Sequence, residues 1–137
     1  MSTIFHYAFK VKDIKSTKEF YTNILGCQSG RETEHWVDFN FFGHQISAHI
    51  SDNIPSLDYC GSVDQVKVPI PHFGCILQEE EFDLVCKKLK ANQIDFIIQP
   101  QTRYKDQNGE QKTMFVLDFS NNAIEFKCFA QQENIFI

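Results

Sequence analysis

The sequence lacks several features that would place it in other classes of protein. No apolar run approaches the roughly 18 residues that a membrane-spanning helix needs, and the opening MSTIFHYAF has neither the basic stretch nor the cleavage site of a secretory signal. No cluster of lysine and arginine occurs, and the formal net charge is -5. This acidic balance argues against a nucleic-acid-binding protein.

The cysteines lack the spacing of a metal or redox motif. They number five, an odd count with no CxxC pair, at Cys27, Cys60, Cys75, Cys86 and Cys128. Three of them stand among apolar neighbours, where a cysteine packs as a small hydrophobic residue. We therefore expect reduced thiols in a cytoplasmic protein rather than a disulfide scaffold.

The chain is well supplied with apolar residues, above all phenylalanine. Hydrophobic residues make up 42% of it, and it has 14 phenylalanines against one tryptophan. This composition is typical of a globular chain and not of a disordered one. A length of 137 residues suits a single domain with a well-buried core.

The first half of the chain predicts one strand, one helix and three further strands. Residues 4–11 are rich in β-branched and aromatic residues, as in a strand. Asp13 can cap the helix that follows, and Gly26 is a natural terminator for it. Extended segments are expected at about 27–34, 35–42 and 44–51.

The second half predicts the same order of elements. Residues 52–70 carry proline and glycine with little periodicity and form a connector. After it we expect a strand at about 71–77, a helix at about 79–92, and strands at about 94–104, 111–119 and 122–129. The helix has apolar residues at i, i+3, i+4 and i+7, which are Phe82, Val85, Cys86 and Leu89. The fold class is therefore α+β, with two βαβββ modules.

Two histidines and one glutamate occupy notable places in this repeat. His6 lies in the opening strand of the first half, His72 in that of the second half, and Glu125 in the last strand. Two imidazoles and one carboxylate on separate strands can form a facial metal site with open coordination positions. The alternatives are ordinary packed histidines and an ion pair of Glu125 with Lys127 or Arg103.

Strand parity indicates which other side chains face the same way. In the last strand, Glu125 lies on the face opposite to the apolar residues Ile124, Phe126 and Cys128. Aligning the two halves places Ser47 opposite Glu125, with Gln45 and His49 on the same polar face. We expect these polar faces to line one concave surface.

The paired βαβββ plan resembles the vicinal oxygen chelate superfamily, which includes glyoxalase I, fosfomycin- and bleomycin-resistance proteins and extradiol dioxygenases. The most specific segments are FHYAFKVKDIKSTKEFYTNILGC and LDFSNNAIEFK, and the resemblance covers essentially the whole chain. It implies a single domain over residues 1–137 whose modules form a curved mixed β-sheet around a central cavity. Module one covers about 1–51, the connector about 52–70 and module two about 71–130, with a short C-terminal tail.

The resemblance also implies the ligands of a divalent metal. These are His6, His72 and Glu125, the three-ligand set of extradiol dioxygenases and fosfomycin enzymes. The position of a fourth ligand, found in glyoxalase I, is Ser47 here. The chain departs from the closing motif at Phe119 and Asn121, where proline and glycine are common.

The implied chemistry is bidentate chelation of an oxygen-bearing substrate to the metal. Iron(II) is the preferred ion, with manganese, zinc or nickel as alternatives. His49 and Tyr104 are the candidate catalytic groups, and Gln45, Ser47 and Arg103 are the candidate pocket residues. Arg103 and Tyr104 face opposite sides of a regular strand, so at most one of them reaches the cavity.

Three functions stay open at this level. The first is a metal-dependent enzyme like an extradiol dioxygenase. The second is a lyase, isomerase or thiol transferase of the glyoxalase or fosfomycin-resistance type, and the third is a metal-free, ligand-sequestering protein of the bleomycin-resistance kind. The acidic chain favours the first over enzymes of anionic substrates, and the three ligands argue against the third. A homodimer is expected, and His6 and His72 of one site can come from one chain or two.

Overall fold

The computed structural model describes residues 2–57, 61–63 and 66–137. The first half contains β1 (His6–Val11), α1 (Ile14–Lys18), η1 (Glu19–Ile24), β2 (Gln28–Glu32), β3 (Trp36–Phe41) and β4 (His44–Ile50). The rest contains β5 (Gly61–Val63), β6 (Val66–Val68), β7 (Phe73–Ile76), α2 (Glu79–Ala91), β8 (Phe96–Arg103), β9 (Gln111–Leu117), β10 (Ala123–Phe129) and η2 (Gln132–Asn134). No helix in these residues is long and apolar enough to cross a membrane.

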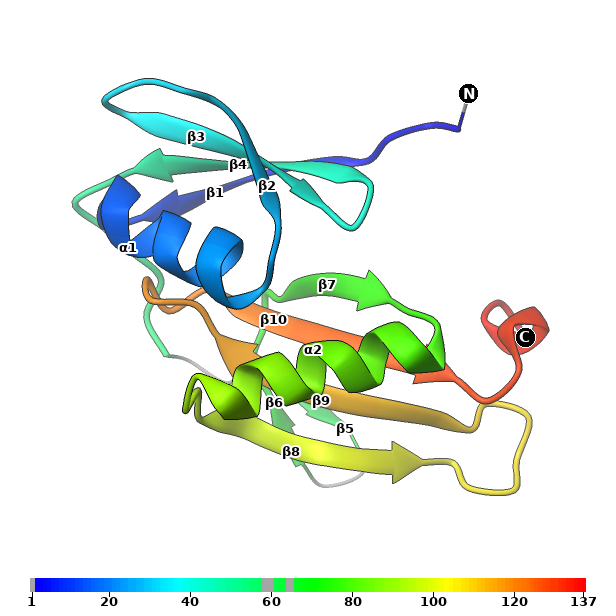
Figure 1. Ribbon diagram of the computed structural model, residues 1–137. Helices are drawn as coiled ribbons and strands as arrows, with labels where there is room; N and C mark the ends of the chain where they lie inside the picture. The colour runs from blue at the N-terminus through cyan, green and yellow to red at the C-terminus, as the bar shows by residue number, and fades with distance from the viewer. Residues whose placement is uncertain (1, 58–60, 64–65) are drawn as a thin grey trace. The chain divides into compact units, whose positions relative to one another are not determined.

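Two four-stranded mixed sheets confirm the predicted α+β fold of two βαβββ modules (Figure 1). Their strand orders are β1-β4-β3-β2 and β7-β10-β9-β8, which are the same order in the two modules. In each sheet the opening strand pairs in parallel with the last strand, and the other pairs are antiparallel. The predicted central cavity stays a prediction, because each sheet is described by itself.

The chain divides into two compact units, and near its end a short segment of the chain belongs to unit 1 again. Unit 1 is 1–58 with 118–122, and unit 2 is 59–117 with 123–137. The connector expected over 52–70 contains the short β5–β6 hairpin, which the sequence pattern did not indicate. Strands of three residues are too short to show a periodicity. Residues 58–60 and 64–65 of this connector, with Cys60, lie outside the described residues.

The helical segment of unit 1 begins and ends where the sequence predicts. The carboxylate of Asp13 accepts a hydrogen bond of 2.6 Å from the backbone N–H of Ser16, and this bond lowers the pKa of Asp13. The segment widens from α1 into the π-helical η1 and stops at Gly26, whose φ is 81°. It buries Phe20 and Tyr21 fully against the sheet.

The loop 118–122 between β9 and β10 completes the core of unit 1. Its Asp118 accepts a hydrogen bond of 2.7 Å from the hydroxyl of the buried Tyr21. Ser120 accepts from the backbone N–H of Lys12 at 2.9 Å, and Asn122 donates to the carbonyl of Lys10 at 2.9 Å. The loop 118–122 is therefore a structural part of unit 1, and its Asn121 has a positive φ of 66°.

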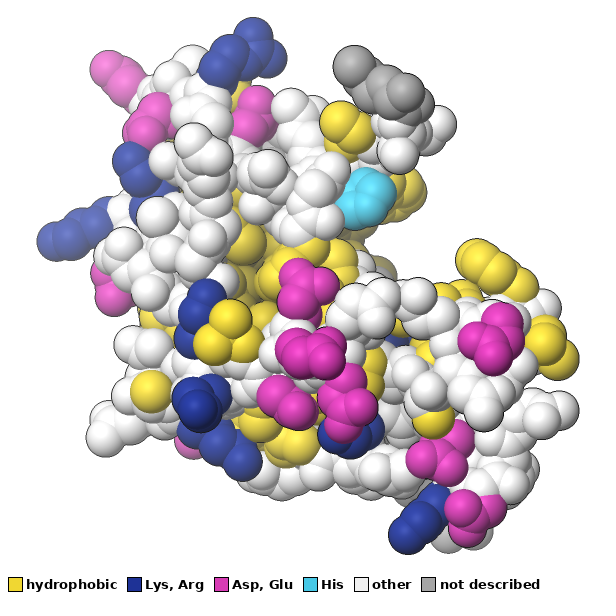
Figure 2. Space-filling view, turned by 45° about the vertical axis from the view of Figure 1, so that its right-hand side comes forward, with side chains coloured by type: hydrophobic (Ala, Val, Ile, Leu, Met, Phe, Trp, Pro, Cys, Tyr) yellow, Lys and Arg dark blue, Asp and Glu magenta, His cyan; other side chains and the backbone are white. Residues whose placement is uncertain are grey.

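In unit 2 the helix α2 covers one face of the second sheet. Its buried residues are Phe82, Val85 and Leu89, whereas Cys86 is only half-buried. On β10 the apolar residues are buried in alternation, and this confirms the predicted parity around Glu125. Acidic side chains gather where α2 begins and basic ones where it ends, as the helix dipole favours (Figure 2).

Candidate metal centre

His72 and Glu125 meet in unit 2, so the structure brings together two of the three predicted ligands. Nε2 of His72 lies 3.3 Å from Oε1 of Glu125. The sequence predicted that His72 lies within a strand, but it immediately precedes β7, which begins at Phe73. Gly74 pairs with Glu125 across the parallel β7–β10 ladder, which places the carboxylate beside the histidine.

The ring of His72 is held from two further directions. Its Nδ1 lies 2.7 Å from the carbonyl oxygen of Pro69, so Nδ1–H donates to that acceptor. The ring also stands edge-on against Phe115, with centroids 4.9 Å apart and planes at 83°. When Nδ1 carries the proton, a neutral imidazole keeps the lone pair of Nε2 for another partner.

Glu125 is fixed through its second oxygen. The buried hydroxyl of Thr113 on β9 donates to Oε2 of Glu125, while Oε1 faces His72. The hydrogen bond with Glu125 raises the pKa of His72 despite the opposing effect of burial. Burial by itself raises the pKa of Glu125, but the bonds from His72 and Thr113 outweigh it and hold that pKa below its ordinary value.

A pocket of about 230 Å³ opens over this pair. Its lining includes His72, Gly74, Glu125 and Lys127. Lys127 shares the face of Glu125 two residues further along β10, so a cation stands beside the carboxylate. Its ammonium also lies 5.8 Å from the ring centroid of Phe129.

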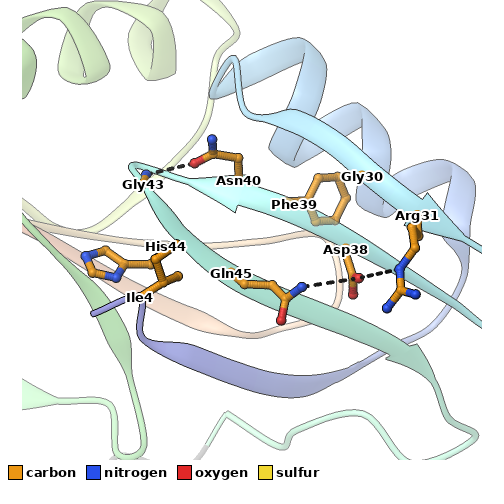
Figure 3. Close-up of a pocket in the computed structure, with 9 residues that line it drawn as sticks. All are labelled: Ile4, Gly30, Arg31, Asp38, Phe39, Asn40, Gly43, His44 and Gln45. Atoms are coloured by element: carbon orange, nitrogen blue, oxygen red, sulfur yellow. Dashed lines mark hydrogen bonds and ion pairs between the residues drawn. The ribbon is translucent and has the colours of Figure 1, made fainter. Parts of the chain in front are cut away.

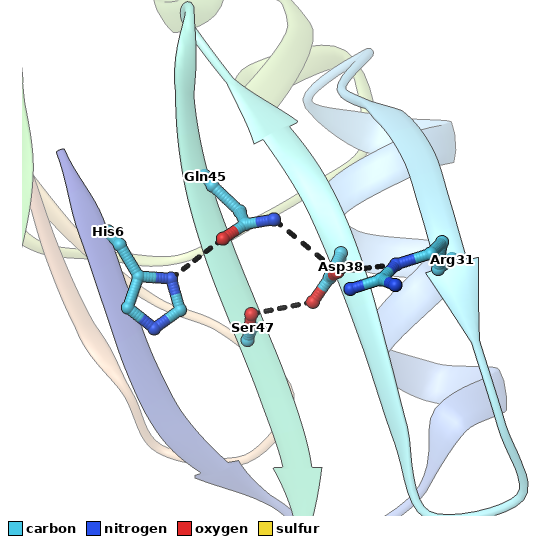
Figure 4. Close-up of polar contacts among 5 residues, drawn as sticks. All are labelled: His6, Arg31, Asp38, Gln45 and Ser47. Atoms are coloured by element: carbon cyan, nitrogen blue, oxygen red, sulfur yellow. Dashed lines mark hydrogen bonds and ion pairs between the residues drawn. The ribbon is translucent and has the colours of Figure 1, made fainter. Parts of the chain in front are cut away.

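His6, the third predicted ligand, lies in unit 1 within a separate polar network (Figure 4). Its Nδ1 is 2.8 Å from Oε1 of Gln45, and Nε2 of that amide is 3.5 Å from Asp38. Asp38 is buried on β3 and accepts a bond of 2.6 Å from Ser47. Nε of Arg31 lies 4.0 Å from the same carboxylate.

Strand register confirms the alignment of the two halves around these residues. Ser47 pairs with Ala8, and Glu125 pairs with Gly74. Each of these partners lies two residues after the histidine of its module, so Ser47 and Glu125 occupy equivalent positions. In unit 1 the hydroxyl stands on the last strand and the carboxylate on its neighbour, whereas in unit 2 the two are exchanged.

A second pocket, of about 320 Å³, lies within unit 1 beside this network (Figure 3). Strands β2, β3 and β4 contribute Arg31, Asp38 and Gln45 to its lining. Gln45 was predicted as a pocket residue and lies here, and the buried hydroxyl of Ser47 is engaged by Asp38.

The remaining predicted residues, His49, Arg103 and Tyr104, make contacts of their own within the two units. His49 is exposed on β4, and its ring centroid lies 6.4 Å from that of Trp36 with the ring planes tilted by 35°. Arg103 ends β8, pairs with Gln111 and lies 5.2 Å from the ring centroid of Tyr104, just past the strand. Because Glu125 pairs with Phe115, four residues along β9 from Gln111, these groups stand roughly 13 Å along the sheet from it.

Sequence reasoning missed three groups that shape the site. Asp38 stands in the apolar run WVDFNF, Thr113 in an ordinary β pattern, and the carbonyl of Pro69 has no sequence signature. The bonds of Asp38 and Thr113 cross between strands, so only the strand register reveals them. Within the described ranges no three His, Cys, Asp or Glu side chains gather around one point.

The fold and a family model together define the class of protein. The family model of the Glyoxalase/Bleomycin resistance protein/Dioxygenase superfamily matches residues 3–126. The chain therefore belongs to this superfamily, as the resemblance in its sequence predicted.

Several known proteins are similar to most of the chain. A glyoxalase/bleomycin resistance protein/dioxygenase from Alicyclobacillus acidocaldarius superposes with a TM-score of 0.84 and 28% identity, covering 98% of this chain and 97% of that one. The fosfomycin resistance protein FosX from Listeria monocytogenes, in a mutant complexed with Mn(II) and 1S,2S-dihydroxypropylphosphonic acid, gives 0.71 and 20%, covering 99% and 98%. The metallothiol transferase FosB of Staphylococcus haemolyticus is 23% identical over 120 residues, 88% of this chain and 78% of that protein.

Proposed function

We propose that the protein is a divalent-metal enzyme of the fosfomycin-resistance type, in which His6, His72 and Glu125 hold the ion. The observation that carries the proposal is the convergence of Nε2 of His72 and Oε1 of Glu125 at 3.3 Å. Each of these two atoms belongs to a side chain whose other polar atom is already bound, to Pro69 and to Thr113. Such outer contacts are the usual supports of metal-ligating side chains.

The separation suits two neighbouring ligands of one cation. Adjacent ligands of an octahedral ion at 2.0–2.1 Å stand about 3 Å apart. A neutral imidazole and a carboxylate bind manganese, iron or zinc alike, so the donor set does not choose among them. The bound Mn(II) of the FosX relative makes manganese the first ion to test, and the expected iron(II) stays an alternative.

The ion would supply Lewis-acid stabilisation of negative charge on a substrate oxygen. The protein's own residues orient the ligands: Pro69 fixes the ring of His72, and Thr113 fixes the carboxylate of Glu125. Phe115 covers one side of the imidazole and keeps water from it. These contacts preserve the site geometry as substrate exchanges with solvent.

The substrate would be a small anionic molecule with adjacent oxygen atoms. Lys127 lines the same pocket as Glu125 and provides the cation that such an anion needs. The acidic net charge weighed against anionic substrates in the sequence, but that charge includes exposed glutamates at the start of α2 and does not report on the pocket. The diol phosphonate in the FosX relative has this chemistry.

The reaction would be the addition of a nucleophile, either a thiol or water, to the chelated substrate. The support is the similarity to a metallothiol transferase and to fosfomycin resistance proteins. No contact among the described residues favours the extradiol dioxygenase over this reading. A homodimer belongs to the same proposal, with His6 and His72 of one site supplied by one chain or by two.

The test is turnover of fosfomycin by metal-loaded protein, followed by ³¹P NMR with a thiol panel or with water alone. We expect a new phosphonate signal with Mn²⁺ that disappears in His72→Gln. Oxygen uptake on catechols with Fe²⁺, without fosfomycin turnover, would replace the proposal with the dioxygenase. Absence of any turnover in protein that binds no divalent metal would leave the ligand-sequestering role.

A further inference from the structure

We propose that Asp38, acting through Gln45, fixes the tautomer of His6 in which Nδ1 carries the proton and Nε2 carries none. This positioning role rests on the proposed function of His6 as a metal ligand. Asp38, Gln45 and His6 stand on three neighbouring strands, β3, β4 and β1 (Figure 4). The contacts run from carboxylate to amide to imidazole, at 3.5 Å and 2.8 Å. Only the register of the sheet brings these three residues into line.

The buried carboxylate of Asp38 sets the orientation of the Gln45 amide. Asp38 accepts from Ser47 at 2.6 Å and faces Nε of Arg31 at 4.0 Å, so its surroundings present donors to it. A carboxylate accepts hydrogen bonds and does not donate them. The amide of Gln45 must therefore turn its NH₂ group toward Asp38, because a carbonyl oxygen there would meet another negative atom.

The orientation of the amide then decides the tautomer of His6. With NH₂ toward Asp38, the oxygen of Gln45 faces Nδ1 of His6, and only a protonated Nδ1 can donate to it. In a neutral imidazole the other nitrogen then carries a lone pair. The bond at one ring nitrogen thus selects the nitrogen that is free to bind a metal.

Another histidine, His44, provides an internal reference. The backbone N–H of Phe5 donates to Nδ1 of His44 at 2.9 Å, so His44 carries its proton on Nε2. His72 faces an acceptor at each ring nitrogen, Pro69 at Nδ1 and Glu125 at Nε2, and so provides no such reference. The contacts therefore predict opposite tautomers for His6 and His44.

Long-range ¹H–¹⁵N correlation NMR of the metal-free protein measures these tautomers directly, at a pH well above the ordinary histidine value of about 6.5. Gln45→Met removes the acceptor at an exposed position, and Gln28→Met is the matched control at an exposed position on β2 of the same sheet. We expect Gln45→Met to lower the Nδ1–H to Nε2–H ratio of His6 about fivefold or more, the equivalent of one lost hydrogen bond. His44 should keep its tautomer in both variants.

Asp38→Asn tests the first link of the line. A neutral amide at this position no longer dictates how Gln45 turns, so the Nδ1–H form of His6 should lose its dominance while Gln45 is still present. Should Asp38→Asn fail to fold, Gln45→Met alone decides. An Nε2–H form of His6 in the wild type, or a tautomer ratio unmoved by Gln45→Met, overturns the proposal.

The consequence for metal binding is a separate measurement. Titration with Mn²⁺ alone, followed by EPR, should show Gln45→Met raising the Kd about 10- to 100-fold, with Gln28→Met unchanged. If the wild type binds no Mn²⁺ but shows the predicted tautomers, the proposed function fails and the line from Asp38 to His6 stands. If Mn²⁺ binds equally well to Gln45→Met, the positioning role is refuted while the metal centre stands.

Discussion

Gly74 allows β7 to lie against the backbone of Glu125, and replacing it should disturb the contact between His72 and Glu125. A Cβ at this position would overlap the carbonyl oxygen of Glu125 and lie 2.6 Å from the carbonyl carbon, whereas real Cβ contacts essentially never fall below 3.0 Å. The obstacle is backbone, which cannot rotate away as a flexible side chain can. The strand would have to shift by about 1 Å or more, an appreciable part of the 3.3 Å between His72 and Glu125.

We therefore expect Gly74→Ala to lower the free energy of unfolding by about 1–3 kcal/mol, as overpacking does. Its Kd for Mn²⁺ should rise as well, because the carboxylate moves with its strand. Gly30→Ala is the matched control, since its Cβ would make an ordinary contact of 3.5 Å with Asp38. Urea unfolding and Mn²⁺ titration measure both effects, and a Gly74→Ala protein with wild-type stability and affinity would refute the reasoning.

Three further predictions concern bonds within each unit. Thr113→Val removes the hydroxyl that orients Glu125 and should weaken Mn²⁺ binding about 10- to 100-fold, whereas Thr113→Ser should retain it; equal Kd values in both variants would count against an orienting role. Tyr21→Phe takes one donor from the buried Asp118 and should cost about 1.5–3 kcal/mol in urea unfolding; an unchanged midpoint would contradict this. In metal-free protein the raised pKa of His72 contributes stability that is complete below pH 6.5 and is lost as the pH rises through the folded-state pKa. The lowered pKa of Glu125 contributes stability that is present above pH 4.5 and is lost as the pH falls through the folded-state pKa. The thermal midpoint of the wild type relative to His72→Gln should thus be greatest between pH 4.5 and 6.5, and a difference independent of pH would exclude the ion pair as its source.

The order of elements could be predicted because turns and periodicities are local properties. Asp13 and Gly26 bound the helical segment, and alternation on β10 placed Glu125 opposite the buried residues. The alignment of Ser47 with Glu125 also followed from the repeat, and the register confirms it. These inferences needed only neighbours along the chain or the comparison of its two halves.

The hydrogen bonds that orient the predicted site residues could not be inferred in this way. Asp38 and Thr113 act across strands, and their partners depend on a register that a single sequence does not specify. The net charge was a poor guide for a related reason, since it sums exposed and pocket residues alike. Lys127 beside Glu125 became apparent only when the face of β10 and its pocket were located.

The most direct test of the central claim is pulsed EPR of Mn²⁺ bound to protein labelled with ¹⁵N-histidine. The account predicts one high-affinity ion per site with two coupled imidazole nitrogens, of which one is lost in His6→Gln and the other in His72→Gln, while Glu125→Gln weakens binding without removing either coupling. An ion without histidine couplings, or couplings that survive both histidine substitutions, would contradict it.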